Sequence, residues 1–139
     1  MITPDELNRR GVGKLPGHLG VHILAVGDRE LRSELAVAPH LMAPNGFLHA
    51  GAVVTLADTS CGYGCVAHLP PGASGFTTVE LKSNHLGTAL DGTVAVVATP
   101  AHLGRTTQVW DAVVTHVQSG RTLVLFRCTQ MVLYARGGA

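Results

Sequence analysis

The segment from residue 50 to residue 67 constrains the fold of this chain more than any other. It reads AGAVVTLADTSCGYGCVA, which is apolar on every side of a helix. A helix without a polar face is stable only where other parts of a protein cover it. Gly51, Gly62 and Gly64 keep the segment slim. The sequence therefore predicts one long buried helix.

The segments on either side of this helix indicate a short helix and two sets of strands. Thr3 is a candidate N-cap and Pro4 a first helical residue, so a helix is expected over residues 3–11. Residues 42–49 are expected to form a loop, because they contain a Pro-Asn-Gly turn. Strand patterns cover residues 19–26, 29–38, 76–86, 93–102, 105–118 and 121–135. A single antiparallel β-sheet wrapped around the long helix accounts for this order, which is an α+β fold.

The length and the charge of the chain limit its possible partners. The length suits one domain over residues 1–139. Only 14% of the residues are charged, against about 25% in a typical soluble domain, so we expect a homo-oligomer that buries part of the surface. The basic residues form no run, which disfavours a nucleic-acid partner. No segment reads as a signal peptide or a membrane span, so we expect a cytoplasmic protein with no membrane partner.

The cysteines and histidines do not indicate a metal centre. The chain has three cysteines, Cys61, Cys65 and Cys128, and they form no CxxC pair. Cys61 and Cys65 lie within the predicted helix, where buried thiols act as small apolar side chains. The eight histidines are scattered without the spacing of metal ligands. Neither a metal nor a cofactor is expected.

Asp58 does not fit a plain buried helix. Between Glu34 and Glu80 the chain has no other Asp, Glu, Lys or Arg. Removing a lone carboxylate from water costs several kcal/mol, and no cation in this stretch can pair with it. Asp58 could have a structural role, on an exposed helix face or as an acceptor of backbone hydrogen bonds. Alternatively it lies at a substrate cavity or a subunit boundary, where desolvation raises its pKa and its basicity.

His49 and the start of the helix are the second candidate group. His49 is about 13 Å from Asp58 along one helix, too far for both to act on one atom. Two antiparallel helices from two subunits would bring Asp58 of one near His49 of the other. The free N–H groups at the helix start, near Ala50 and Gly51, can bind an anion or a carbonyl oxygen. The acid of one subunit and the N–H donors of the other would together form an acyl-transfer site. The simpler alternative for His49 is a structural one, in which its side chain forms a hydrogen bond to the nearby loop.

These residues resemble a known signature. The stretch GFLHAGAVVTLAD is similar to that of the hotdog-fold thioesterases, which is a glycine, two residues, His-Gly-Gly, and an acid nine residues after the His. Phenylacetate-pathway and 4-hydroxybenzoyl-CoA thioesterases carry it, and HLGRTTQVWDAVVT and RTLVLFRCTQMVL resemble late strands of the same family. The resemblance implies an acyl-CoA thioesterase with a hotdog fold. It also implies a dimer whose two long helices lie side by side in one continuous sheet, commonly paired into a tetramer.

The resemblance also implies roles for individual residues. Asp58 matches the catalytic acid, which acts as a nucleophile or as a base for water. Ala50 matches the glycine whose backbone N–H polarises the thioester carbonyl, with Gly51 after it. His49 matches the His that fixes the loop and the helix start. Thr78 matches a hydroxyl that helps to hold the attacking water in some members.

Two positions depart from the family pattern. Ala50 replaces the first glycine of His-Gly-Gly, which is tolerable if only its N–H is used. Ala43 stands six residues before the His, where many members carry Asn or Gln. Asn45 is the candidate replacement, so Asn45 and its neighbour Gly46 are the expected substrate-binding residues of the loop. A missing amide would weaken activation of the carbonyl.

Two other functions are compatible with the sequence. A hotdog dehydratase or hydratase also pairs a His with an acid, but at other spacings. A non-catalytic acyl-CoA binding module would keep the cavity, although a binder gains nothing from a desolvated carboxylate. The acyl group is left open. The candidate contacts for the CoA phosphates are Lys82, Arg105, Arg127 and Arg136, and the favoured alternative for each is a solvated charge at a strand edge.

Overall fold

The computed structural model describes residues 1–136. Before the long helix lie α1 (Pro4–Gly11), α2 (Leu15–Leu19), β1 (His22–Gly27), β2 (Glu30–Ala36) and the 3-10 turn η1 (Pro39–Leu41). The long helix is α3 (Ala50–Ala67). After it come β3 (Ala73–His85), β4 (Thr93–Leu103), β5 (Thr107–His116) and β6 (Thr122–Tyr134). The boundaries of α3 are those expected from its uninterrupted apolar character.

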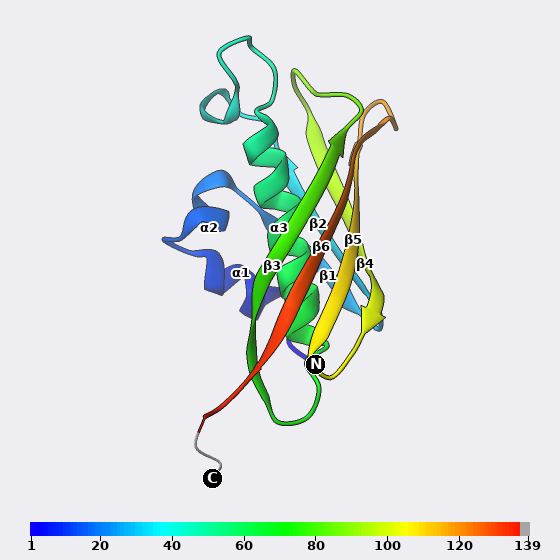
Figure 1. The fold of residues 1–139 in the computed structure, drawn as a ribbon. Helices are drawn as coiled ribbons and strands as arrows, with labels where there is room; N and C mark the ends of the chain where they lie inside the picture. Colours follow the sequence, from blue (N-terminus) through cyan, green and yellow to red (C-terminus); the bar gives the residue numbers. More distant parts are fainter. Residues whose placement is uncertain (137–139) are drawn as a thin grey trace.

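All six strands form one sheet, in the order β1-β2-β4-β5-β6-β3. Every neighbouring pair is antiparallel. The sheet curves around α3, which runs along one of its faces (Figure 1). The predicted α+β arrangement is confirmed. β3, the strand after the helix, comes last in this order with β6 as its neighbour, so it forms one edge of the sheet.

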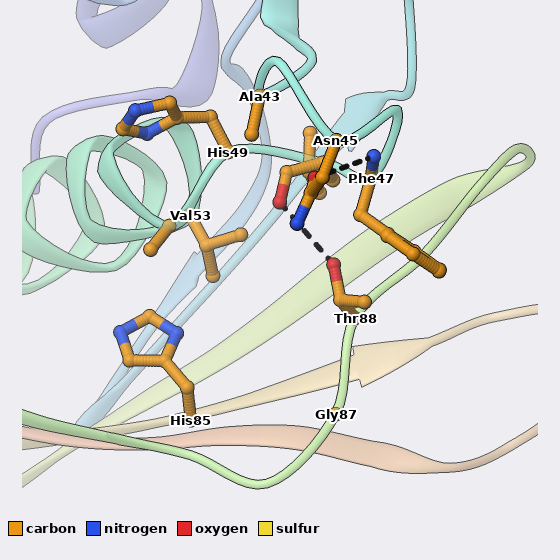
Figure 2. A pocket seen from close by; sticks show the side chains of 10 residues that line it. Ala43, Asn45, Phe47, His49, Val53, His85, Gly87 and Thr88 are labelled. Carbon is orange, nitrogen blue, oxygen red and sulfur yellow. Dashed lines mark hydrogen bonds between the residues drawn. The ribbon is translucent and has the colours of Figure 1, made fainter.

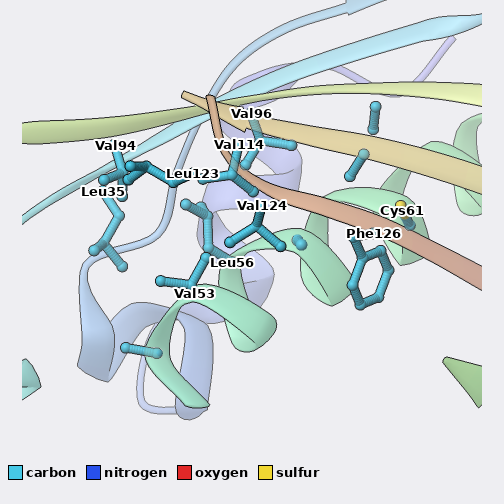
Figure 3. Packing of buried hydrophobic residues seen from close by; sticks show 14 of the residues in the cluster. Leu35, Val53, Leu56, Cys61, Val94, Val96, Val114, Leu123, Val124 and Phe126 are labelled. Carbon is cyan, nitrogen blue, oxygen red and sulfur yellow. The ribbon is translucent and has the colours of Figure 1, made fainter. Parts of the chain in front are cut away.

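The core lies between α3 and the inner face of the sheet. Leu56 and Cys61 of α3 are fully buried and belong to one core with buried residues of the strands (Figure 3). The labelled strand residues are Leu35, Val94, Val96, Val114, Leu123, Val124 and Phe126. The three cysteines are buried and free, which confirms that Cys61 and Cys65 act as core side chains. In the part of the chain that the structure describes, no helix is long and apolar enough to cross a membrane.

The glycines of α3 let aromatic rings approach the helix backbone. A Cβ added at Gly64 would lie 2.7 Å from the Trp110 ring, and one at Gly62 would lie 2.9 Å from the Phe76 ring. Trp110 is fully buried, and its indole N–H donates to Gln108 Oε1 at 2.8 Å. The two aromatic rings therefore fill the space beside Gly62 and Gly64. No room is left for an acyl group at these two positions.

The segment before β1 differs from the prediction. Strand was expected from residue 19, but Leu15–Leu19 forms the short helix α2, and β1 begins at His22. A Cβ at Gly17 would lie 2.2 Å from the carbonyl oxygen of Gly11, so the backbones of α1 and α2 touch there. A Pro-Gly pair normally indicates a turn. Here it marks a close approach between two helices.

The two edge strands of the sheet, β1 and β3, differ in what covers their backbone groups. At the β1 edge, the Asn8 side chain accepts from Ile23 N at 2.8 Å and donates to Ile23 O at 3.1 Å, as a neighbouring strand would. At the β3 edge most side chains are exposed, among them Val79 at 55% and Leu81. An open edge strand of this length is a template for pairing with another chain. Asn8 therefore covers the β1 edge at Ile23, whereas no such side-chain pairing occurs along the longer β3 edge among residues 1–136.

Candidate active site

His49 organises the start of α3. It is the N-cap residue, and its Nδ1 accepts a hydrogen bond from Gly51 N at 2.7 Å. A neutral ring that accepts at Nδ1 carries its proton on Nε2. Because Gly51 N–H is consumed by this cap, it is not free to bind a ligand. His49 therefore lies at the helix start, as predicted, and serves there as the helix cap.

A pocket of about 320 Å³ opens beside this helix start (Figure 2). Its walls come from the loop before α3, the first turn of α3, and the end of β3 with the residues after it. Its lining includes Ala43, Asn45, Phe47, Ala50, Val53 and His85. Ala50 is the first residue of α3, so its N–H has no acceptor within the helix. The pocket is therefore lined by a residue whose backbone N–H has no acceptor in α3.

The loop wall of the pocket is held by backbone contacts. Met42 and Leu48 form an isolated antiparallel bridge. Leu48 N donates to Ala89 O at 2.9 Å, and Thr88 Oγ1 donates to Leu48 O at 3.2 Å. Within the loop, Phe47 N donates to Asn45 Oδ1 at 3.1 Å. These bonds hold the loop against the segment that follows β3.

Asp58 lies on α3, away from this pocket. It is half-buried, and its Oδ1 is a buried atom without a hydrogen-bond partner in residues 1–136. Desolvation raises the pKa of the Asp58 carboxyl above its usual value. Asp58 is eight residues after Ala50, about 12 Å along the helix axis. Within one chain, the acid and the free N–H do not meet.

The other predicted residues divide between the pocket and the surface. Asn45, His49 and Ala50 line the pocket. Gly46 is exposed in the turn next to Asn45 and has a φ of 88°, which glycine tolerates. Thr78 is exposed on β3. The structure therefore brings three of the predicted residues together at the pocket, and the other four, Gly46, Gly51, Asp58 and Thr78, lie outside its lining.

His85 lines the pocket and was not predicted. It is the last residue of β3, its ring points toward Val53 (Figure 2), and its Nε2 lies 3.0 Å from Ser83 Oγ. The register of β3 shifts between Thr78 and Glu80, so Val79 is an extra residue in the strand. After this bulge, odd-numbered residues continue on the face that Thr78 occupies. Strict alternation from Thr78 would instead have placed His85 on the opposite face.

The candidate cations do not gather at the pocket. Arg127 Nε donates to Asp111 Oδ1 at 2.5 Å, and this ion pair raises the pKa of Arg127. Lys82 pairs in register with Arg127 and lines a groove with it on the outer face of the sheet. Arg105 and Arg136 are exposed. No group of three or more His, Cys, Asp or Glu side chains suited to a metal ion occurs among the described residues.

Comparison with known proteins identifies the family. The model of the thioesterase superfamily matches residues 45–123, which contain the pocket loop from Asn45 onward and the whole of α3 with Asp58. The chain belongs to the thioesterase superfamily. It is 33% identical to 1,4-dihydroxy-2-naphthoyl-CoA hydrolase of Escherichia coli, over 95% of this chain and 96% of that protein. It is 34% identical to the proofreading thioesterase EntH of Cronobacter turicensis, over 95% of each chain. The prediction of a thioester hydrolase is confirmed.

Solved structures give the same result for the fold. A thioesterase of Haemophilus influenzae superposes with a TM-score of 0.91 at 28% identity, covering 99% of this chain and 95% of that one. A mutant thioesterase of Pseudomonas aeruginosa superposes with a TM-score of 0.90 at 29% identity, covering 96% and 95%. Together with the family match, these similarities confirm that this thioester hydrolase has the predicted hotdog fold.

Proposed function

We propose that this thioester hydrolase acts on acyl-CoA, at sites formed between two subunits. The observation that carries the proposal is the separation of two complementary groups in one chain. Ala50 offers a backbone N–H with no acceptor in α3 at a pocket, and about 12 Å away Asp58 offers a desolvated carboxylate whose Oδ1 has no partner among residues 1–136. In an antiparallel pair of α3 helices, Ala50 of each subunit would lie beside Asp58 of the partner subunit. The CoA part of the substrate is supported by the relative named as a naphthoyl-CoA hydrolase.

The proposed dimer forms through the β3 edge. That edge is open, whereas Asn8 occupies the β1 edge. Pairing of two β3 strands would continue the sheet across the dimer and set the two α3 helices side by side. Further pairing into a tetramer is the family arrangement that the sequence resemblance implies. The low charge of the chain is consistent with this additional burial.

In the proposed reaction, the N–H of Ala50 donates to the thioester carbonyl oxygen and stabilises the negative charge that develops there. Asp58 of the partner subunit acts in one of two ways. As a base it takes a proton from water while the water oxygen attacks the carbonyl carbon. As a nucleophile it attacks the carbon itself and forms an anhydride that water then opens. In both routes the C–S bond breaks, the thiol of CoA leaves with a proton, and no cofactor takes part.

The remaining predicted residues have supporting roles in this proposal. His49 holds the helix start, because its ring occupies Gly51 N–H and leaves Ala50 N–H as the free donor. Thr78 would hold the attacking water from its exposed place on β3. Asn45 and Gly46 would contact the substrate from the loop. The protein is proposed to work in the cytoplasm, where acyl-CoA is made and used.

A hydrolysis screen tests the proposal directly. The purified protein is incubated with short, medium, long and aromatic acyl-CoA, and the free thiol of CoA is measured. Aromatic acyl-CoA is expected to react fastest, in keeping with the naphthoyl-CoA hydrolase among the relatives. The Asp58→Asn variant, which keeps the shape of the side chain, measures background release. Thiol release from no member of the panel, or equal release by the variant, would rule the proposal out.

A further inference from the structure

The pocket lacks a side-chain donor at the position where the family pattern has one. Ala43 lines the pocket, but its methyl group cannot donate a hydrogen bond. A carbonyl oxygen bound there would have the N–H of Ala50 as its only donor from this helix start. Loss of one donor from an oxyanion site typically costs about 10²–10³ in turnover. A second donor elsewhere in the pocket would remove this deficit.

Asn45 has a side chain that is oriented to provide it. Its Oδ1 accepts from Phe47 N, and a backbone N–H can be accepted only by the oxygen of the amide. This bond fixes which end of the amide is which. The amide nitrogen Nδ2 therefore lies on the other side and points into the pocket (Figure 2). Its two N–H groups make no hydrogen bond to any residue from 1 to 136.

The position of the amide is also held by its own loop. Ala43 N donates to Phe47 O at 2.7 Å, and Gly46 N donates to Ala43 O at 2.9 Å, so the turn that carries Asn45 is closed on itself. Gly46 adopts a φ of 88°, which a residue with a side chain adopts with strain. A donor that is fixed before the substrate arrives requires no reorganisation during the reaction. This is the property that distinguishes an oxyanion donor from an ordinary surface amide.

We propose that Asn45 Nδ2 is the second donor to the thioester carbonyl oxygen, alongside Ala50 N. Asn45 replaces, from two positions later in the chain, the amide that Ala43 cannot supply. It is a catalytic residue in this proposal, because it touches the reacting group. The inference rests on the proposed function, since it assigns a donor for the same carbonyl.

His85 is the competing donor. It lines the same pocket from the opposite wall, and its Nε2 is engaged with Ser83 Oγ. Its remaining nitrogen is held by no hydrogen bond to residues 1–136, so nothing in this part of the chain fixes its tautomer. A test must therefore separate Asn45 from His85.

The first experiment measures kcat and KM on the best acyl-CoA of the screen. Asn45→Ser keeps a short oxygen that can accept from Phe47 N but removes the amide donors, so kcat should fall by about 10²-fold with KM little changed. Adding Ala43→Gln to this variant should restore at least a tenth of the parent kcat, because the amide returns at the family position. Asn84→Ser, at a residue placed by its register with Leu125 on the outer face of the sheet, is the matched control and should be unchanged. Parental kcat in Asn45→Ser, or a comparable loss only in His85→Gln, would overturn the assignment.

A second experiment does not require turnover. A ketone analogue of acyl-CoA, with CH₂ in place of the sulfur, presents the same carbonyl but cannot be hydrolysed. The infrared band of its carbonyl should move to lower frequency on binding to the parent, and part of this shift should be lost in Asn45→Ser. An identical band in both proteins would overturn the role of Asn45 even if the parent hydrolysed no acyl-CoA. Conversely, an inactive parent that shows the shift would refute the proposed hydrolysis and retain the contact.

Discussion

At the scale of single residues, Asp58 is a half-buried carboxyl whose desolvation is not offset by any hydrogen bond to its Oδ1 from residues 1–136. Its Oδ1 is buried without a partner, and no cation lies near it in the sequence. An amide of the same shape would remove the charge and keep the packing. Asp58→Asn should therefore lower turnover by about 10²-fold or more, while the thermal midpoint stays level or rises. A fully active but destabilised variant would show that the carboxylate serves the structure instead.

The pH dependence of Asp58 gives a second test. Its folded pKa is raised by desolvation, so its contribution to stability is present below the ordinary value of 3.8 and is lost as pH rises through the folded pKa. The stability gain of Asp58→Asn should thus be largest near neutral pH and should vanish as pH falls toward 3.8. Unfolding by urea at several pH values measures the difference. A gain that grows on acidification has the wrong sign for this explanation. Activity should be lost on acidification at a pH above 3.8, because the acid must be ionised to act.

Substitutions at Ala50 test the backbone N–H donor, because they leave every other proposed site residue unchanged. It is the first residue of α3, where proline is well tolerated, and His49 before it is extended (φ −65°, ψ 134°), as a residue before proline must be. Ala50→Pro should therefore fold, yet it should lose nearly all turnover because proline has no N–H. Ala50→Gly keeps the N–H and should remain within a few-fold of the parent. Circular dichroism confirms folding, and parental turnover in the proline variant would exclude the donor.

At the scale of elements, the sequence predicted what depends on composition and missed what depends on contacts. The bounds of α3 could be predicted because an apolar segment between polar loops has one stable placement. The bulge at Val79 could not be predicted, because an inserted residue in a strand leaves no compositional sign. Without the bulge, the face of the sheet on which His85 lies could not be predicted either. The helix α2 was missed for a similar reason. Its Pro16-Gly17 pair serves a contact with Gly11 that is visible only in three dimensions.

The packing of α3 against the sheet is tested at Gly64. Alanine gains about 1 kcal/mol over glycine inside a helix, but the new Cβ would lie 2.7 Å from the buried Trp110 ring. This ring cannot move freely, because its N–H is bonded to Gln108, whose amide donates to the carbonyl of His68. Overpacking of this kind costs about 1–3 kcal/mol. Gly64→Ala should lower the midpoint of urea unfolding, whereas Gly75→Ala, with no atom within 4 Å of its added Cβ, should not. Equal midpoints for both variants would mean that the ring adapts.

At the scale of the whole molecule, the described chain carries the proposed acid Asp58 and the proposed donor Ala50 but does not bring them together within one subunit. The sequence and the family resemblance predicted Asp58 as the acid, His49 as the residue that fixes the helix start and Ala50 as the donor, and these roles stay predictions. The sequence could not predict which edge of the sheet remains open. That depends on Asn8, whose amide occupies the β1 edge across a separation in the chain that no local pattern reveals.

The open β3 edge therefore gives the test on which the two-subunit proposal depends. Val79 and Leu24 are both exposed apolar residues at bulges, one on each edge strand, with exposures of 55% and 46%. Lysine on an edge strand opposes pairing with another chain, because two-fold pairing would bring equal charges together. Val79→Lys should yield a folded monomer by light scattering, with turnover lost although the pocket residues and Asp58 are untouched. Leu24→Lys should keep both the oligomer and the activity. A monomeric Val79→Lys that hydrolyses thioesters at the parental rate would show that one subunit completes the reaction alone, and the proposed pairing of Ala50 with Asp58 of the partner subunit would then be wrong.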